Sequence, residues 1–290
     1  MSSSVSRSGR KSHFELFLRR FCRNKLAVAG FIFIVFIILV AIFAPYIAPY
    51  GYDDQNVSIR LQEPSSEHWF GTDDLGRDVF SRMIYGARVS LSVGISTTTI
   101  SMFVALIIGM ISGYYGGRTD NIIMRIIDIF LAIPSILLSI AIAATLGGGI
   151  ASMLIAISIG AVPGVSRLIR AQVMAECHKE YVEAARVTRA SDFRIMFKYI
   201  FPNISSVFIV TFTMGVAGGI LNASMLSFIG LGAQPPTPEW GAMLSNGREY
   251  IRDYPYLVTY PGLMISLTVF AINMFGDGLR DALDPKLKGR

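Results

Sequence analysis

The chain has 290 residues, of which 52% are hydrophobic and 16% are charged, and its mean hydropathy is +0.52. This composition is typical of integral membrane proteins and excludes an ordinary soluble domain. The formal net charge of +6 indicates membrane topology and contact with anionic lipid, so the sequence predicts no nucleic-acid partner.

Residues 1–25 predict a basic cytoplasmic arm that precedes the first membrane span. Its apolar residues Phe14, Phe17, Leu18 and Phe21 recur at helical spacing, opposite the basic residues Arg19, Arg20 and Arg23. This pattern favours an interfacial amphipathic helix along the inner leaflet, after which the chain turns into the bilayer. The alternative is a basic tail with little fixed structure.

Residues 26–290 predict a domain of six transmembrane helices, which makes the fold class all-α integral membrane. Uncharged tracts cover residues 26–44, 90–117, 129–166, 204–238 and 254–276. A helix needs roughly 20 apolar residues to cross the hydrocarbon core. The tract 129–166 is too long for one span, and we expect it to break at Gly147, Gly148 and Gly149.

Lysine and arginine are concentrated in three places: before the first span, between the fourth and fifth spans, and after the sixth. Basic residues favour the cytoplasmic side of a membrane protein. The sequence therefore predicts cytoplasmic N- and C-termini, a cytoplasmic loop at 167–203, and external loops at 46–86 and 231–255. The first apolar tract ends at Pro45 and Pro49 without a cleavage site, so we expect it to be retained.

The two external loops carry different signals. In the first, Asp73, Asp74 and Asp78 suggest calcium, but the ligand spacing of an EF-hand loop is missing, and a cap at Thr72 or Asp73 for a helix leading into span two is favoured. The second is amphipathic after its prolines. It predicts a re-entrant helix from about Pro238 to Tyr250 that folds back over the outer mouth.

Within the membrane, charged residues are few and small residues recur. Arg125 and Asp128 lie three apart in span three, so a structural ion pair is favoured over the alternative, an ion-coupling carboxylate at Asp128. Small residues spaced four apart predict close helix packing, either within the chain or against a partner subunit. They are Ala105, Gly109 and Gly113 in span two and Gly215 and Gly219 in span five.

The cytoplasmic loop 167–203 predicts a helix, a turn and a second helix. Glu183 is spaced to pair with Lys179 and Arg186, and Ala184 and Ala185 form a small-residue patch beside it. Ser191 or Asp192 would cap the second helix, which we expect to end where Pro202 begins span five. Such ordered polar sequence predicts a docking surface for another protein.

No catalytic signature is present in the sequence. It lacks a phosphate-binding loop, an HExxH motif and a nucleophile elbow, and its histidines and cysteines have no metal-ligand spacing. We therefore expect a non-enzymatic chain with neither catalytic nor metal-binding residues. For a transport pathway the mixed polar surface of span five is favoured: Met214, Gly218, Asn222 and Ser224. Asn222 has an equal alternative role in bonding a neighbouring helix.

The cytoplasmic loop resembles the EAA loop of ABC importer permeases. Glu183, Ala184, Ala185 and Pro202 stand at the matching positions, whereas Arg189 replaces the usual glycine. A residue with a side chain pays roughly 1–2 kcal/mol in the left-handed conformation that such a turn uses. Either the turn is built differently, or Arg189 accepts the strain. The resemblance implies a coupling helix that seats in the ATPase subunit, with these residues at the contact: Glu180, Glu183, Ala184, Ala185, Arg186, Arg189, Ser191 and Asp192.

Nearly the whole chain is similar to the C-type subunit of dipeptide/oligopeptide permeases. The similarity lies in EHWFGTDDLGRDVFSRMIYGARVSL, in the EAA loop, and in FIGLGAQPPTPEWGAML. It implies a type I ABC importer fold in a bacterial or archaeal plasma (inner) membrane. The implied substrates are di- or oligopeptides; nickel, metallophores or glutathione are the alternatives, and an ion-coupled secondary carrier is less favoured.

The same resemblance implies partners. They are a second, homologous permease that forms the pathway with this chain, two cytoplasmic ATPase subunits and an extracytoplasmic solute-binding protein. Membrane lipid surrounds the chain itself. ATP and magnesium would be bound by the ATPase subunits, so this chain would hold no cofactor.

Overall fold

The structure, a computed structural model, describes residues 13–283, which form helices and loops with no named strand. Five of these helices are long and apolar enough to span a membrane, and a sixth span arises if a bent helix pair is counted as one. This confirms the all-α architecture. The spans are α2 (Lys25–Ile42), α4 (Val79–Tyr115), the pair α5 (Gly117–Leu131) and α6 (Ser135–Leu146), α7 (Ile150–Cys177), α10 (Phe201–Phe228) and α12 (Tyr256–Leu283).

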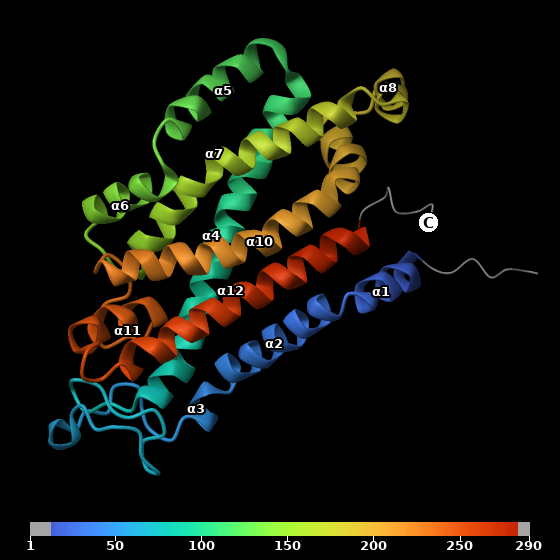
Figure 1. The fold of residues 1–290 in the computed structure, drawn as a ribbon. Helices are drawn as coiled ribbons and strands as arrows, with labels where there is room; N and C mark the ends of the chain where they lie inside the picture. The colour runs from blue at the N-terminus through green and yellow to red at the C-terminus, as the bar shows by residue number, and fades with distance from the viewer. Residues whose placement is uncertain (1–12, 284–290) are drawn as a thin grey trace, which may run out of the picture.

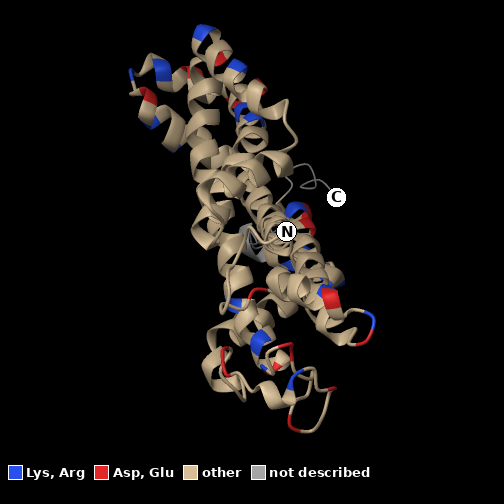
Figure 2. Cartoon of the chain, turned by 90° about the vertical axis from the view of Figure 1, so that its left-hand side faces the viewer, with Lys and Arg blue, Asp and Glu red and all other residues tan. Residues whose placement is uncertain are grey.

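The shorter elements lie at the ends of the bundle (Figure 1). α1 (His13–Arg23), α8 (Glu180–Val187), α9 (Asp192–Arg194) and η2 (Ile195–Ile200) share one end with the last residues of α12. α3 (Ala44–Ile47), η1 (Val57–Ile59), α11 (Trp240–Gly247) and η3 (Arg248–Tyr250) lie at the other. Charged residues cluster toward the helix ends and the connecting segments, and the long helices are uncharged between them (Figure 2). We call the two ends cytoplasmic and external, following the predicted orientation.

The core forms where α4 packs along α7 and α10. The small residues of α4 and α10 set how closely the helix backbones approach each other. A Cβ atom on Gly113 would lie 2.8 Å from the backbone oxygen of Arg170, and one on Gly215 would lie 2.8 Å from Thr98. Contacts this short leave no room for a side chain, so the small residues serve packing within the chain.

The predicted break at Gly147–Gly149 is confirmed, because α6 ends at Leu146 and α7 begins at Ile150. The preceding span is not straight: α5 and α6 meet at 82°. Pro134 precedes the first residue of α6 and cannot donate a backbone hydrogen bond, which accounts for the interruption.

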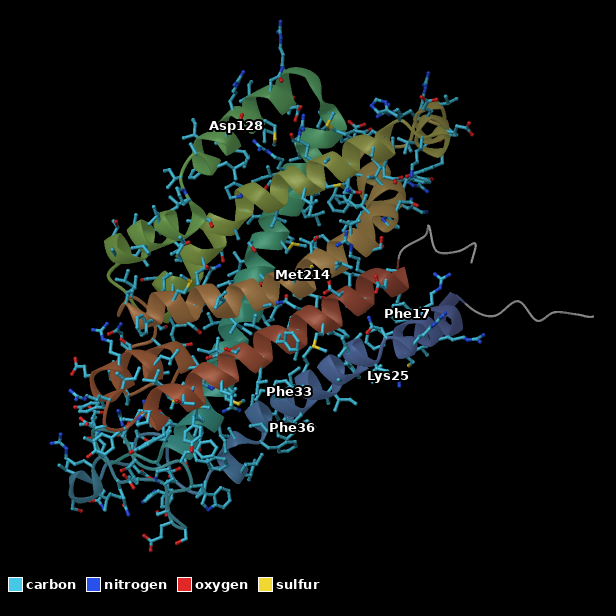
Figure 3. All side chains as sticks on the ribbon, in the orientation of Figure 1. Phe17, Lys25, Phe33, Phe36, Asp128 and Met214 are labelled. Carbon is cyan, nitrogen blue, oxygen red and sulfur yellow. The ribbon has the colours of Figure 1, made fainter. Side chains whose placement is uncertain are left out.

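The predicted Arg125–Asp128 ion pair is wrong. Asp128 accepts a hydrogen bond from Arg167 of α7 instead, and Arg170 binds Asp120 with two nitrogens. Because α5 bends away from α6, its acidic residues face the arginines of α7. Two ion pairs therefore hold α5 against α7, and Figure 3 shows Asp128 on α5, toward α7.

The N-terminal helix α1 continues along the line of α2 (Figure 1), and the expected turn into the bilayer is absent. Only Asn24 interrupts the two helices, where its side chain caps α2 by accepting the Ala27 N–H at 3.2 Å. Phe21 of α1 packs edge-on against Phe275 of α12, with ring centroids 5.7 Å apart. Residues 1–12 of the predicted arm lie outside the described residues.

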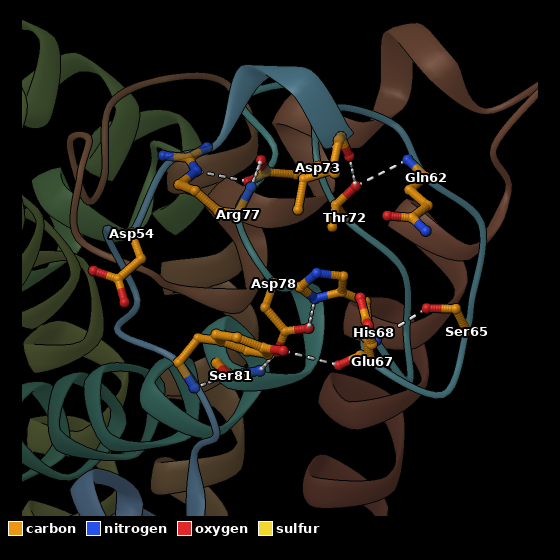
Figure 4. A network of polar contacts seen from close by, with 12 residues as sticks. Asp54, Gln62, Ser65, Glu67, His68, Thr72, Asp73, Arg77, Asp78 and Ser81 are labelled. Carbon is orange, nitrogen blue, oxygen red and sulfur yellow. Dashed lines mark hydrogen bonds and ion pairs between the residues drawn. The ribbon is translucent and has the colours of Figure 1, made fainter.

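The external loop ends earlier than its predicted boundary at residue 86, because α4 begins at Val79. The cap expected at Thr72 or Asp73 is provided by Asp78, which accepts the Ser81 N–H at 2.7 Å and contacts His68 Nδ1 at 2.9 Å (Figure 4). Asp73 binds Arg77 at 2.7 Å. No cluster of possible metal ligands occurs in residues 13–283.

Candidate functional site

The cytoplasmic helix α8 is held in place by one buried face. Val182 has no exposed surface and Ala185 is 6% exposed, and both pack with η2 residues such as Ile195 and Ile200. Burying a valine side chain stabilises a fold by roughly 1.5–3 kcal/mol. The predicted surface patch is therefore smaller than expected: Ala184 is exposed, but Ala185 belongs to the core because it shares the helix face of Val182.

The opposite face of α8 presents Glu180 and Glu183 to the outside. The ion pairs predicted for Glu183 do not form in the described part of the chain. Lys179 precedes the helix in an extended conformation and binds Glu176 at 2.5 Å, and Arg186 lies over the Tyr114 ring at 5.4 Å. Glu183 is thus left available for a partner.

Two large apolar side chains of this loop are exposed. Val187 is 84% exposed at the end of α8, and Phe193 is 68% exposed on α9 and contacts the Phe197 ring at 4.6 Å. The sequence pattern of residues 193–200 indicates an apolar side of the second helix but not which residues of that side remain uncovered.

The turn between α8 and α9 is closed by a residue in the left-handed conformation, although that residue is not a glycine. Arg189 adopts φ 54°, its N–H binds the Arg186 carbonyl at 2.9 Å, and the Ala190 N–H binds the Ala185 carbonyl at 3.1 Å. This pair of bonds is the Schellman motif that closes many helices with a left-handed residue. Arg189 therefore accepts the strain, and the sharp turn is kept.

Relief of that strain is measurable. Arg189→Gly is expected to raise the free energy of unfolding by about 1 kcal/mol, because glycine adopts φ > 0 without steric cost. Thermal unfolding of the purified chain would report this as a higher midpoint. Arg189→Ala removes the guanidinium but keeps the Cβ atom, so it should give no such gain. An equal rise in both variants would show that side-chain removal, and not the backbone, is responsible.

Beyond the turn, Ser191 provides the cap by accepting the Arg194 N–H at 3.4 Å. Asp192 accepts hydrogen bonds from Tyr114 at 2.7 Å and from Tyr115 at 3.2 Å, which tie the second helix to the cytoplasmic end of α4. The predicted end of this helix at Pro202 is wrong: the chain stays helical from Asp192 to Phe228. The π-helical turn η2 precedes the proline and gives the widened backbone that tolerates it.

Two neighbouring pockets lie along α10. One, of about 380 Å³, is bounded mainly by α4, α7 and α10, and the other, of about 420 Å³, reaches the ends of α7 and α12 near Arg280. Thr211 and Met214 line both pockets, which therefore adjoin along α10, and we call the two together the α10 groove. Arg280 is the sole charged residue in the lining of the two pockets.

The groove brings together three of the four pathway candidates. Met214, midway along α10 in Figure 3, lines it with Gly218 and Asn222. Ser224 does not, because it is buried and turns toward Glu239 at 3.5 Å. The lining also includes Thr97, Thr98 and Ser101 of α4, which supply hydroxyl groups. In the sequence, only the helical spacing of these three residues indicates that they share one face of α4.

Comparison with known families decides the class of protein. Residues 105–289 match the family described as binding-protein-dependent transport system inner membrane component, and residues 12–64 match the N-terminal transmembrane domain of oligopeptide transport permease C. The chain belongs to this family of transport permeases. It is accordingly a multi-pass inner membrane protein.

Curated relatives resemble the permease over most of their length. The dipeptide transport system permease protein of Alkalihalophilus pseudofirmus is 50% identical over 92% of this chain and 88% of its own. The di/tripeptide transport system permease protein of Pseudomonas aeruginosa is 46% identical over 96% and 93%. The glutathione transport system permease protein of Pectobacterium atrosepticum is 45% identical over 94% and 91%.

A solved structure supports the fold of the permease independently. The MetNI methionine ABC transporter in inward-facing conformations aligns with a TM-score of 0.57 at 18% identity, covering 71% of this chain and 98% of that one. At this identity the match establishes the fold alone, which is that of a type I ABC importer permease.

Proposed function

We propose that the permease carries di- or oligopeptides across the membrane as one half of an ATP-driven importer. A second, homologous permease would complete the pathway, and an extracytoplasmic binding protein would deliver the substrate. The proposal rests on one observation above all, the similarity to dipeptide and di/tripeptide permeases along nearly the entire chain. Glutathione is the second candidate substrate, on the strength of the comparable match to a glutathione permease.

The α10 groove suits such cargo. Its lining is uncharged apart from Arg280 at the cytoplasmic end, and threonine, serine and asparagine side chains supply polar groups. A fixed charge in a narrow passage would hold peptides of opposite charge and repel those of like charge. A neutral lining with weak polar contacts lets peptides with different side chains pass.

Energy would come from two ATPase subunits that bind ATP and magnesium and dock on α8. Glu183, Val187 and Phe193 form the exposed group that we call the docking face. It combines an acidic side chain without a partner in residues 13–283 with two uncovered apolar ones. Interfaces typically combine a buried apolar centre with charged groups that fix orientation.

Reconstitution tests the function directly. The permease, its partner permease and the ATPase subunits would be placed in liposomes with ATP inside and the binding protein outside. We expect labelled dialanine to accumulate only when ATP and the binding protein are both present. Accumulation of glutathione but not of dialanine would favour the second candidate. Uptake driven by an ion gradient without ATPase subunits would overturn the proposal.

The rival mechanism, ion coupling at Asp128, makes a different prediction. The Asp128 and Arg167 side chains pair with each other, and neither lines the α10 groove. Asp128→Asn is therefore expected to leave ATP-driven dipeptide uptake close to that of the parent. Loss of uptake in a fully assembled complex would identify Asp128 as a coupling carboxylate.

A further inference from the structure

The cytoplasmic pocket of the α10 groove gathers three polar side chains from three helices. Arg280 of α12, Gln172 of α7 and Ser206 of α10 all line this pocket of about 420 Å³. None of the three side chains makes a hydrogen bond or an ion pair within residues 13–283. Binding pockets typically combine an apolar lining with a few convergent polar groups. The three side chains are therefore available to a ligand in the pocket.

The three groups suit one chemical class of ligand. A guanidinium carries only hydrogen-bond donors, and the Gln172 amide and the Ser206 hydroxyl each have a donor to offer. Among the described residues, no acidic side chain lines the pocket. Arginine binds a carboxylate through two parallel charge-assisted hydrogen bonds. The donor set therefore favours a carboxylate.

The rest of the pocket is mostly apolar and runs along α10. Val207 and Val210 line it between Ser206 and Met214, and Leu168 lines it from α7. Ser206 and Met214 are about 12 Å apart along the helix axis, at ~1.5 Å per residue. Two extended residues of a peptide span at most about 7 Å. The pocket thus has room for a dipeptide whose carboxylate lies at the donors and whose side chains contact the valines.

The external pocket of the groove differs in charge and in donors. Its lining contains no charged residue, and the Thr97 and Thr98 hydroxyls donate to carbonyls of their own helix at 2.9 Å and 2.8 Å. Arg280 lies near the end of α12, at the cytoplasmic end of the bundle (Figure 1). Of the two pockets, the cytoplasmic one alone offers a cation to a carboxylate.

We propose that Arg280, together with Gln172 and Ser206, forms a subsite that receives the C-terminal carboxylate of the transported peptide at the cytoplasmic end of the groove. The inference rests on the proposed import function and names the part of the substrate that the permease contacts. At neutral pH every peptide carries this carboxylate, whatever its side chains. Arg280 would therefore select for a free carboxyl end and not for a particular sequence.

The test supplies peptide from the cytoplasmic side, where it cannot meet the binding protein. Liposomes with the complete complex hold ATP and either unlabelled dialanine or dialanine amide inside, and labelled dialanine with the binding protein outside. The measured quantity is the internal concentration that halves the initial rate of labelled uptake. We expect this concentration to be about ten-fold lower for dialanine than for its amide, because the amide lacks the charge-assisted contact.

Variants assign this difference to the subsite. In Arg280→Gln the two compounds should inhibit alike, and Arg280→Lys, which keeps the charge without the two parallel bonds, should restore part of the difference. Gln172→Leu should reduce it by a smaller factor. Arg118→Gln is the matched control, because Arg118 is an exposed arginine of α5 that lines neither pocket and has no partner within residues 13–283. It should keep the full difference.

Equal inhibition by the two compounds in the parent would overturn the subsite, and so would a full difference that persists in Arg280→Gln. If Arg280→Gln slowed uptake only in liposomes containing phosphatidylglycerol, and not in phosphatidylcholine alone, the occupant would be a lipid headgroup and the peptide subsite would be wrong. A parent complex that takes up no labelled dialanine with ATP and the binding protein present would instead contradict the import function itself.

Discussion

A permease carrying Glu183→Arg is expected to fold and enter the membrane but to lose its ATPase subunits. Glu183 is exposed and makes no hydrogen bond within residues 13–283, so reversing its charge should cost little stability. In the proposed docked state the arginine would place a positive charge where the Glu183 carboxylate is expected to meet the ATPase subunit. Disrupting a buried charged contact costs about 2–5 kcal/mol, which weakens association by more than ten-fold.

Co-purification of the ATPase subunits with a tagged permease, together with dipeptide-stimulated ATP hydrolysis, measures this loss. Glu249→Arg is the matched control, since Glu249 is an exposed glutamate in η3 at the opposite end of the bundle. Assembly at the parental level in the Glu183→Arg complex would show that α8 does not carry the docking contact. Val187→Asp, which alters the same face without reversing an existing charge, should act in the same direction.

A large loss of stability is expected where a side chain is added between α4 and α7. Gly113→Ala would place a methyl group 2.8 Å from the Arg170 carbonyl oxygen and from the Val173 side chain, so the two helices must move apart. Overpacking of this kind costs typically 1–3 kcal/mol. Because α4 also lines the α10 groove, we expect transport to decline together with the thermal midpoint.

Gly164 of α7 is a control of the same chemical type. A Cβ atom there meets nothing within 4 Å, and alanine favours the helix by up to about 1 kcal/mol over glycine. Gly164→Ala should therefore keep or raise the midpoint of thermal unfolding in detergent. If the two variants unfolded at the same temperature, the close approach of α4 and α7 would not limit stability.

Local signals in the sequence predicted much of the fold. Three consecutive glycines marked the break before α7, and the polar stretch after Pro238 predicted the short helix now seen as α11, because both signals act over a few residues. Local signals could not identify the ion-pair partner of Asp128. Arg125 was near in sequence, but Arg167 became near only through the bend between α5 and α6.

The sequence predicted which segment of the chain holds the candidate docking site, but not which side of α8 faces outward. Glu183 and Ala184 stand exposed on α8, yet Ala185 turned inward, because burial of Val182 fixes the rotation of the helix about its axis. That rotation depends on η2, a tertiary neighbour that no local pattern identifies. The sequence left two possible conformations for Arg189 and could not decide between them. The steric cost of its positive φ is offset by tertiary packing, which no local pattern identifies.

The helix that runs unbroken from Asp192 to Phe228 has a consequence for the timing of transport. Its first residues lie beside the docking face, and Met214 in the groove follows them on the same continuous helical segment, which contains the π-helical turn η2 and Pro202. No loop separates the two points, so a shift imposed at the cytoplasmic end reaches the groove through helical backbone alone. Substrate contacts and ATPase contacts would then change in the same step.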